Sequence, residues 1–348
     1  YSAMSIQYSR GCPFDCDFCD IIILNGHKPR TKSAPQFIRE LDAIYNRGWR
    51  GAVFVVDDNF IGNKTKLKAE ILPAIINWRQ TKRHAPPLFT EASINLADDI
   101  ELMRLMTQAG FDRVFVGIET PNEASLVECN KTQNENRDLV AAVKKIQNFG
   151  MEVQGGFIVG FDNDPASIFK RQIEFIQKSG IVTAMVGLLN APRGTRLYER
   201  MKKENRLVQN FTGDNTDSSL NFVPKMKTEE LIEGYKHILG SIYAPKAYYE
   251  RISTFLKEFH PHYTGRSFQI KFYHVVGLVK SLWILGVIDK GRRQFWKFIL
   301  SVAVKRPKSL PLSLVLSAYG FHFRKVYAKI AKNNNPRNSK NIRGTEII

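Results

Sequence analysis

Short apolar segments rich in β-branched residues recur along the first two thirds of the chain, and helical patterns lie between them. We predict six strands, at residues 5–8, 52–56, 88–93, 113–118, 152–159 and 182–189. Strands that alternate with crossover helices form parallel sheets with right-handed connections. Six units are too many for a mononucleotide-binding fold and too few for a complete eightfold barrel. The pattern therefore favours an α/β fold built as a partial (β/α)6 barrel of the TIM type.

The helical patterns carry recognisable start and stop signals. Ser33 can cap a helix whose apolar positions share one face, and Gly48 can end it. After Pro224 the pattern changes to helices without intervening strands, in segments 245–259, 267–288, 292–305 and 309–330. We therefore expect the barrel in residues 1–224, a helical region in 225–331 and a disordered tail in 332–348. The aromatic stripe of segment 245–259 is expected to be core.

Positive charge is concentrated in the last third of the chain. The whole chain has a formal net charge of +18, and residues 225–348 carry 23 Lys and Arg against 7 Asp and Glu. This excess indicates an anionic partner, either a membrane surface or nucleic acid. The longest nearly apolar run, Val275 to Ile288, is interrupted by Lys280 and is shorter than the roughly 20 residues of a bilayer span. We predict no transmembrane helix.

Three of the four cysteines lie within eight residues, at Cys12, Cys16 and Cys19. This set gives no even-numbered disulfide framework, so a reducing compartment, the cytoplasm, is expected, with membrane association through the basic third. Thiolates at the spacing C-x3-C-x2-C select zinc or an iron–sulfur cluster. Zinc needs a fourth ligand at similar spacing, but Cys129 is remote and His27 is the only nearby imidazole. We expect Cys129 to be an ordinary small buried residue.

Polar residues cluster directly after the predicted strands. They are the cysteine loop and residues 57–59, 91–95, 119–120, 160–162 and 190. In barrel enzymes the carboxyl ends of the strands share one face, and the chemistry takes place there. The sequence therefore predicts a single polar site at this face.

The pattern C-x3-C-x-aromatic-C, formed by Cys12, Cys16, Phe18 and Cys19, resembles the signature of the radical S-adenosylmethionine (SAM) superfamily. The resemblance implies a radical SAM barrel in which the three cysteines hold a [4Fe-4S] cluster. It also implies that the fourth iron binds the amino and carboxylate groups of SAM. An electron passed to SAM would then release methionine and a 5′-deoxyadenosyl radical, which abstracts hydrogen from the substrate.

Two further stretches resemble SAM contacts of the superfamily. "VVDDNF" offers Asp57, Asp58 and Asn59 where the family binds the SAM amino group, and carboxylates suit an ammonium. In "FVGIET", Glu119 occupies the position of a polar contact to the ribose or carboxylate. An acidic turn without a ligand is the alternative reading of the first stretch.

The ends of the last two strands resemble the remaining contacts. "GGFIVGFDND" provides Gly156, Ile158 and Gly160, as in the motif beside the adenine, but Asn163 replaces the final Glu of that motif. "LLNAPRGTRLYE" resembles the turn that closes the barrel, where Asn190 could reach the cofactor or substrate. A structural turn is an equal reading.

Longer stretches, among them "VDDNFIGNK", "VFVGIETPN" and "GFIVGFDND", resemble the cobalamin-dependent branch that includes the hopanoid methylases. That branch has an N-terminal cobalamin domain, for which this chain has no room. We expect a truncated chain; the alternatives are that cobalamin comes from elsewhere or is not used. The resemblance implies methylation of an unactivated carbon, with methylcobalamin as methyl donor, and reduction by flavodoxin or ferredoxin. The basic third suggests a lipid substrate reached at an anionic membrane surface; a helical lid packed on the barrel, with a solvated basic exterior, is an equal reading. An RNA-modifying enzyme and a non-catalytic iron–sulfur or zinc protein are the alternatives; no residue is assigned as a general base.

Overall fold

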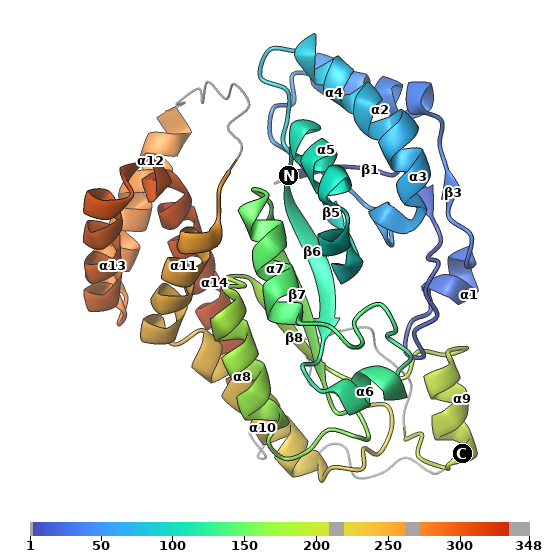
Figure 1. Cartoon of the computed structure of the whole chain (residues 1–348). Helices are drawn as coiled ribbons and strands as arrows, with labels where there is room; N and C mark the ends of the chain where they lie inside the picture. Colours follow the sequence, from blue (N-terminus) through green and yellow to red (C-terminus); the bar gives the residue numbers. More distant parts are fainter. Residues whose placement is uncertain (1–2, 209–218, 262–271, 334–348) are drawn as a thin grey trace. The chain divides into compact units, whose positions relative to one another are not determined.

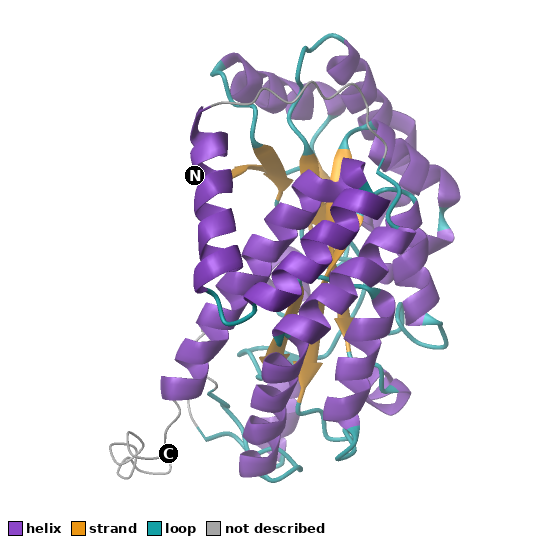
Figure 2. Cartoon of the chain, turned by 90° about the vertical axis from the view of Figure 1, so that its left-hand side faces the viewer, coloured by secondary structure: helices purple, strands orange, loops and turns teal. Residues whose placement is uncertain are grey.

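The computed structural model describes residues 3–208, 219–261 and 272–333. Six strands form one sheet in the order β1-β4-β5-β6-β7-β8. Their bounds are Ala3–Ile6 (β1), Ala52–Val55 (β4), Leu88–Glu91 (β5), Phe111–Glu119 (β6), Glu152–Val159 (β7) and Ala184–Leu188 (β8). Neighbours from β1 to β7 pair in parallel, and the helices between them can be followed in Figures 1 and 2. The predicted six-stranded α/β fold is confirmed.

The residue contacts divide the chain into two compact units. The first consists of Tyr1–Phe157, Pro192–Leu197 and Glu258–Ser267, and the second of Ile158–Ala191, Tyr198–Lys257 and Phe268–Ile348. The tail predicted to be disordered begins at residue 332. Residues 332 and 333 are the last two of the final helix, and residues 334–348 lie outside the described residues.

The helices of the first unit are mostly short. They are α1 (Ile21–Asn25), α2 (Ala34–Asn46), α3 (Lys64–Lys66), α4 (Leu72–Gln80), α5 (Ile100–Gln108), α6 (Glu123–Glu128) and α7 (Leu139–Asn148). Helix α2 begins as predicted, because Ser33 and Gln36 form a reciprocal capping box. It ends at Asn46, and Gly48 follows with a φ of 84°, a conformation that glycine adopts without a steric penalty.

The core of the first unit is built from alternate residues of the strands. Val53 and Val55 of β4 and Val114 and Val116 of β6 are fully buried, whereas their immediate neighbours are less so. This alternation is the period of two that a strand imposes on its side chains. The β-branched runs in the sequence are therefore the segments that fill the core.

A small antiparallel pair lies beside the sheet and was not predicted. Strand β2 (Ser9–Arg10) pairs with β3 (Arg30–Thr31), and the cysteine loop and α1 lie between them. Two-residue strands carry no periodicity that could be detected in a sequence. Their effect is to bring the two ends of the cysteine segment together.

The second unit is helical apart from the end of β7 and strand β8, as expected for the C-terminal part. Its helices are α8 (Ile168–Ser179), most of α9 (Arg196–Lys203), α10 (Thr228–Ile242), α11 (Pro245–Glu258), α12 (Phe272–Trp283), α13 (Arg292–Lys305) and α14 (Leu310–Asn333), with a π-helical segment η4 (Ile284–Ile288) after α12. Tyr248, Ile252 and Phe255 of α11 are fully buried, which confirms that the aromatic stripe is core. Among the described residues, no helix combines the length and apolar character needed to cross a membrane.

Candidate functional site

The three clustered cysteines lie on the loop between β2 and α1, in the first unit. Backbone hydrogen bonds fix this loop from three directions: Cys12 N to Gly26 O (3.2 Å), Asp17 N to Cys129 O (2.9 Å) and Leu197 N to Asp17 O (3.0 Å). Arg196 adds ion pairs to Asp15 and Asp17. The loop is therefore anchored by segments that lie far from it in the sequence.

The three thiols lie close enough to influence one another electrostatically. Burial, and after it the neighbouring Cys16 and Cys12, raises the pKa of Cys19 to about 11, although a backbone hydrogen bond from Ile21 opposes this. Burial also raises the pKa of Cys16, with Cys12 adding a small effect in the same direction. Such thiols stay protonated until a metal displaces the proton. The cysteines thus converge on one site.

Three thiolates alone are an incomplete ligand set for a single zinc ion. Four ligands around zinc place their sulfurs within about 4 Å of one another, given a Zn–S bond of about 2.3 Å. Within the described residues, no group of three His, Cys, Asp or Glu side chains is arranged to hold one ion. Three soft thiolates on one loop fit a polynuclear iron–sulfur cluster, in which each ligand binds a different iron.

Cys129 is buried and contacts the cysteine loop. Its Sγ donates to Leu126 O at 3.5 Å, and its carbonyl accepts the amide of Asp17. Burial strongly raises the pKa of this thiol. The residue supports the loop through its backbone, and its side chain packs like a small apolar group, in keeping with the sequence analysis.

The two aspartates of the acidic turn after β4 have different hydrogen-bond partners. Asp57 is 1% exposed, and its oxygens accept hydrogen bonds from Tyr8 N (2.7 Å), Ser9 N (2.8 Å) and Ser9 Oγ (2.6 Å). These bonds tie the end of β1 to β4, so Asp57 is a structural clamp. Asp58 accepts through Oδ2 alone, from Gly11 N (3.0 Å) and Asn25 Nδ2 (3.1 Å). Asp58 is therefore the better placed of the two carboxylates to receive the SAM ammonium.

Asn59 faces the first cysteine. Its Nδ2 lies 3.2 Å from Ser93 Oγ and 3.9 Å from Cys12 Sγ, and its Oδ1 accepts the amide of Ser93 at 3.2 Å. The side chain thus links the end of β4 to the residue that follows β5, beside a predicted cluster ligand. The structure brings Asn59 and the cysteines together as the sequence analysis predicted.

Glu119 forms a buried ion pair with a residue that the sequence analysis did not single out. Its Oε1 lies 2.7 Å from Nζ of Lys131, and their side chains are 9% and 12% exposed. The Lys131 ammonium also lies 5.8 Å from the centre of the Phe18 ring. Burial lowers the pKa of Lys131, but the charge of Glu119 raises it by more, so Lys131 stays protonated. A fixed positive charge therefore stands beside the cysteine loop.

Glycines make room for this ion pair. A Cβ at Gly117 would lie 2.3 Å from Glu119 Oε1 and 2.9 Å from Lys131 Nζ. Gly156 of β7 is the register partner of Gly117, and a Cβ there would lie 2.9 Å from the Phe115 ring. Gly156 therefore lies next to the site, and its lack of a side chain leaves room for the Phe115 ring.

The remaining predicted contacts lie in the second unit. The amides of Gly160 and Phe161 donate to Asp164, at 2.9 and 3.1 Å. Asn190 donates through Nδ2 to Ser219 O (3.2 Å) and accepts through Oδ1 from Asn221 N (3.0 Å), so it closes a turn. Ile158 lies at the end of β7 in this unit. The roles of Ile158, Gly160 and Asn190 toward SAM stay predictions.

Glu91, at the end of β5, belongs to the polar set that the sequence places on the shared face, but no role was assigned to it. Burial, and after it the negative charge of Asp58, raises the pKa of Glu91 to about 7. A carboxyl group that gains a proton near neutral pH is typical of functional sites. Sequence alone could not single it out, because its pKa depends on the neighbouring strand.

The raised pKa of Glu91 predicts a pH dependence of stability. The folded state binds the Glu91 proton more tightly than the unfolded chain, so its ionisation lowers stability as pH rises from about 4.5 to about 7. We expect Glu91→Gln to be more stable than the parent at pH 8, by at most about 3 kcal/mol. The difference should shrink at pH 5, as urea unfolding of both proteins at the two pH values would measure. An equal difference at both values would contradict the assignment.

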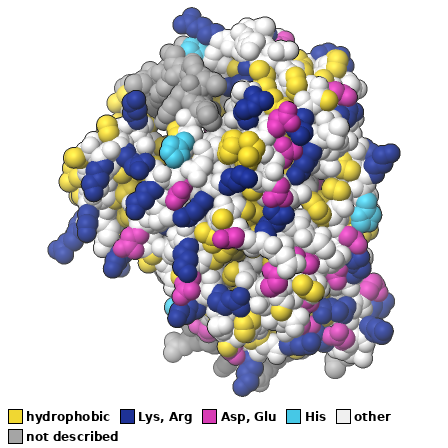
Figure 3. Space-filling model, in the orientation of Figure 1, with side chains coloured by type: hydrophobic (Ala, Val, Ile, Leu, Met, Phe, Trp, Pro, Cys, Tyr) yellow, Lys and Arg dark blue, Asp and Glu magenta, His cyan; other side chains and the backbone are white. Residues whose placement is uncertain are grey.

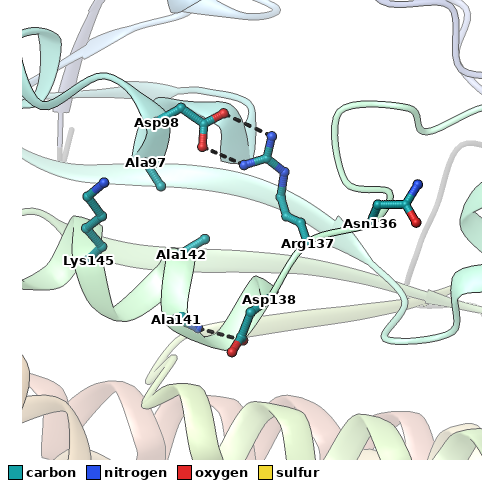
Figure 4. A pocket seen from close by; sticks show the side chains of 8 residues that line it. All are labelled: Ala97, Asp98, Asn136, Arg137, Asp138, Ala141, Ala142 and Lys145. Atoms are coloured by element: carbon teal, nitrogen blue, oxygen red, sulfur yellow. Dashed lines mark hydrogen bonds and ion pairs between the residues drawn. The ribbon is translucent and has the colours of Figure 1, made fainter.

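A pocket of about 410 Å³ lies elsewhere in the first unit. It is lined by residues of η3 (Ile94–Asp98), of the loop that precedes α7 and of α7 itself, and Figure 4 shows Arg137 reaching across to Asp98. The two guanidinium nitrogens lie 2.6 and 2.9 Å from the carboxylate oxygens. None of the predicted site residues lines this pocket, whose Arg137 and Asp98 neutralise each other.

Family comparisons agree with this geometry. The profile of the Radical SAM superfamily matches residues 6–176, and that of a domain of unknown function, DUF4070, matches residues 195–335. An uncharacterised methyltransferase of Synechocystis is 39% identical over 93% of this chain, and the hopanoid C-2 methylase of Rhodopseudomonas palustris is 32% identical over 95%. The chain spans 60% and 62% of the lengths of these two relatives.

Solved structures show the same fold at low sequence identity. The radical SAM methyltransferase TsrM of Kitasatospora setae, with cobalamin and a [4Fe-4S] cluster bound, has a TM-score of 0.55 and 13% identity, covering 95% of this chain and 61% of its own. The cobalamin-dependent enzyme OxsB has a TM-score of 0.52 and 14% identity, covering 99% and 56%. Residues 6–176 of this chain are therefore a radical SAM domain.

Proposed function

We propose that this chain is the radical-generating part of a methyltransferase that adds a methyl group to an unactivated carbon. The observation that carries the proposal is the anchored loop of Cys12, Cys16 and Cys19, placed at the strand ends beside the buried Glu119–Lys131 pair. A radical is needed where no acid–base route to a carbon exists. The names of the two relatives above, a methyltransferase and a methylase, support methyl transfer.

The donor set fits an iron–sulfur cluster and SAM. When bound, the cluster would supply the electron that breaks a carbon–sulfur bond of SAM, and cobalamin would supply the methyl group. Of the chain's own residues, the three cysteines hold the irons, and Asp58 presents a carboxylate to the SAM ammonium. Cobalamin dependence is supported by the bound cobalamin of TsrM and by the name of OxsB. Flavodoxin or ferredoxin is the proposed electron donor.

The test of this proposal is reductive cleavage of SAM. The chain is reconstituted anaerobically with iron and sulfide, reduced with dithionite and incubated with SAM, and 5′-deoxyadenosine is measured against a Cys16→Ala control. Formation of 5′-deoxyadenosine that disappears in the control is the expected result. A fully assembled cluster that leaves SAM intact would contradict the radical-generating role of this chain.

A lipid substrate reached at an anionic membrane is part of the proposal, and a surface of the second unit supports it. Val275, Val279, Trp283 and Val287 lie four residues apart along α12 and η4, and Trp296, Leu300 and Val304 do so along α13; all are exposed. Trp283 is 60% exposed and Leu300 59%. Trp296 Nε1 donates to Gly286 O at 2.9 Å, which joins the two stripes. We call this surface the α12–α13 face.

Positive charges surround the α12–α13 face. Lys280, Lys290, Arg292, Arg293, Lys297 and Lys305 are exposed, and Figure 3 shows Lys and Arg beside hydrophobic side chains over this part of the molecule. Asp289, the one acidic residue in the sequence from 272 to 305, is paired with Arg324 at 2.7 Å. Apolar side chains with a basic surround match the interface of an anionic bilayer. Arg293 and Lys297 also line a pocket of about 350 Å³ with Lys246 and Glu250.

Vesicle binding tests the α12–α13 face. The chain should co-sediment with vesicles that contain phosphatidylglycerol, and bind much less to pure phosphatidylcholine or at high salt. Trp283→Ser with Leu300→Ser should weaken binding about tenfold or more, because each removes apolar area from the bilayer. Ile100→Ser, at an equally exposed position of the first unit, is the matched control. Equal binding by all variants, or salt-sensitive retention of RNA without vesicle binding, would overturn the membrane proposal.

A further inference from the structure

A glutamine that no sequence motif marks donates a hydrogen bond to a cluster ligand. Nε2 of Gln133, on the loop between α6 and α7, lies 3.6 Å from Sγ of Cys16, 117 positions away in the sequence. Gln133 is 7% exposed. Because a thiolate only accepts hydrogen bonds, it selects the amide orientation that points the N–H groups at the sulfur. Gln133 is thus a preformed donor to the Cys16 sulfur.

The carbonyl oxygen of the Gln133 side chain makes no such hydrogen bond within the part of the chain that the structure describes. Oε1 of Gln133 is buried and has no hydrogen-bond partner among the described residues. Burying an amide while leaving one end unpaired costs free energy. The placement of Gln133 is therefore poorly explained by the stability of the protein alone, and the hydrogen bond that its side chain makes goes to the sulfur.

The loop around Gln133 holds it in place. Asn130 Nδ2 donates to Asp15 O at 2.8 Å, and Asn134 Nδ2 donates to the carbonyl oxygens of Gly117 and Ile118 at 3.0 Å each. Between them, Lys131 is fixed by its ion pair with Glu119. The same short segment thus brings an N–H donor and a cation to the cysteine loop.

We propose that Gln133 is a positioning residue that raises the reduction potential of the cluster bound by Cys12, Cys16 and Cys19. The proposal rests on the proposed function for the presence of the cluster. One-electron reduction adds a negative charge that spreads onto the ligand sulfurs. The N–H dipole of Gln133, aimed at one ligand sulfur, stabilises this charge and makes reduction easier. The electron comes from the one-electron donor, and no bond is made or broken in this step.

A redox titration tests the role of Gln133 without SAM or substrate. The reconstituted chain is titrated anaerobically with dithionite, and the reduced cluster is followed by electron paramagnetic resonance. Gln133→Leu should assemble the same amount of cluster with a more negative midpoint potential. Gln133→Glu, which replaces the donor by a carboxylate, should shift the midpoint further in the same direction.

Gln147→Leu is the matched control, because Gln147 is a fully buried glutamine of α7 whose amide has no hydrogen-bond partner among the described residues. Its midpoint should equal that of the parent. An unchanged midpoint in Gln133→Leu would overturn the proposal, and so would loss of the cluster, which would make Gln133 an anchor. Failure of SAM cleavage with an intact midpoint shift would count against the proposed function alone, so the two proposals can fail separately.

Discussion

Replacing Cys16 with alanine is expected to abolish assembly of the [4Fe-4S] cluster. In the proposed site each of the three cysteines would supply the thiolate for one iron, and Cys16 is the buried member that accepts the hydrogen bond from Gln133. Cys12→Ala and Cys19→Ala should have the same effect. Iron and sulfide content after anaerobic reconstitution, together with the visible absorption of the cluster, would measure the loss.

Cys129→Ala is the matched control for these variants. Its thiol is buried and bonded to Leu126 O, and its contribution to the loop is made by its carbonyl group, which alanine retains. We therefore expect a full complement of iron and sulfide in Cys129→Ala. Loss of the cluster in this variant would show that the fourth cysteine is a ligand and would overturn the assignment.

Replacing Lys131 with methionine should destabilise the folded chain by about 3–5 kcal/mol, the usual cost of leaving one partner of a buried ion pair uncompensated. The Glu119 carboxylate would keep its charge in a site where its side chain is only 9% exposed. Urea unfolding of the cluster-free chain at pH 7 would measure the change. A loss well under 1 kcal/mol would mean that water reaches the pair freely, contrary to its burial.

Two further variants separate the ion pair from other effects at this position. Adding Glu119→Gln to Lys131→Met removes the stranded charge and should restore much of the lost stability. Lys170→Met breaks a pair of comparable type with Glu174 on the exposed surface of α8 and should change stability little. If the double variant were no more stable than Lys131→Met, the loss would have to come from packing around the lysine stem.

Most of the fold followed from local pattern. The six strands were placed within a few residues because buried parallel strands are continuous apolar runs, and each run here is bounded by turn residues. Ser33 and Gly48 marked the ends of α2 because caps act through neighbours in the sequence. The β2–β3 pair escaped prediction, since pairing of two-residue strands depends on the chain returning to the same place.

The candidate site was only partly predictable for the same reason. The cysteine motif is contiguous, so its chemistry could be stated from spacing. The turn at residues 57–59 was correctly placed at a strand end, but the sequence treated its two aspartates alike. The structure separates them, because Ser9 and Tyr8 take the oxygens of Asp57 and leave one oxygen of Asp58 outside these bonds.

By itself, the sequence determined the strand order along the chain, the candidate cluster ligands and the excess of positive charge near the C-terminus. Each of these depends on residues that are close together in the chain. Only the tertiary structure decided which groups surround the cysteine loop. Lys131 and Gln133 approach Cys16 from more than a hundred residues away, and the pKa of Glu91 is raised by Asp58, which follows the neighbouring strand. Charge, burial and hydrogen bonding act through space, so these residues acquire their roles only when the chain folds.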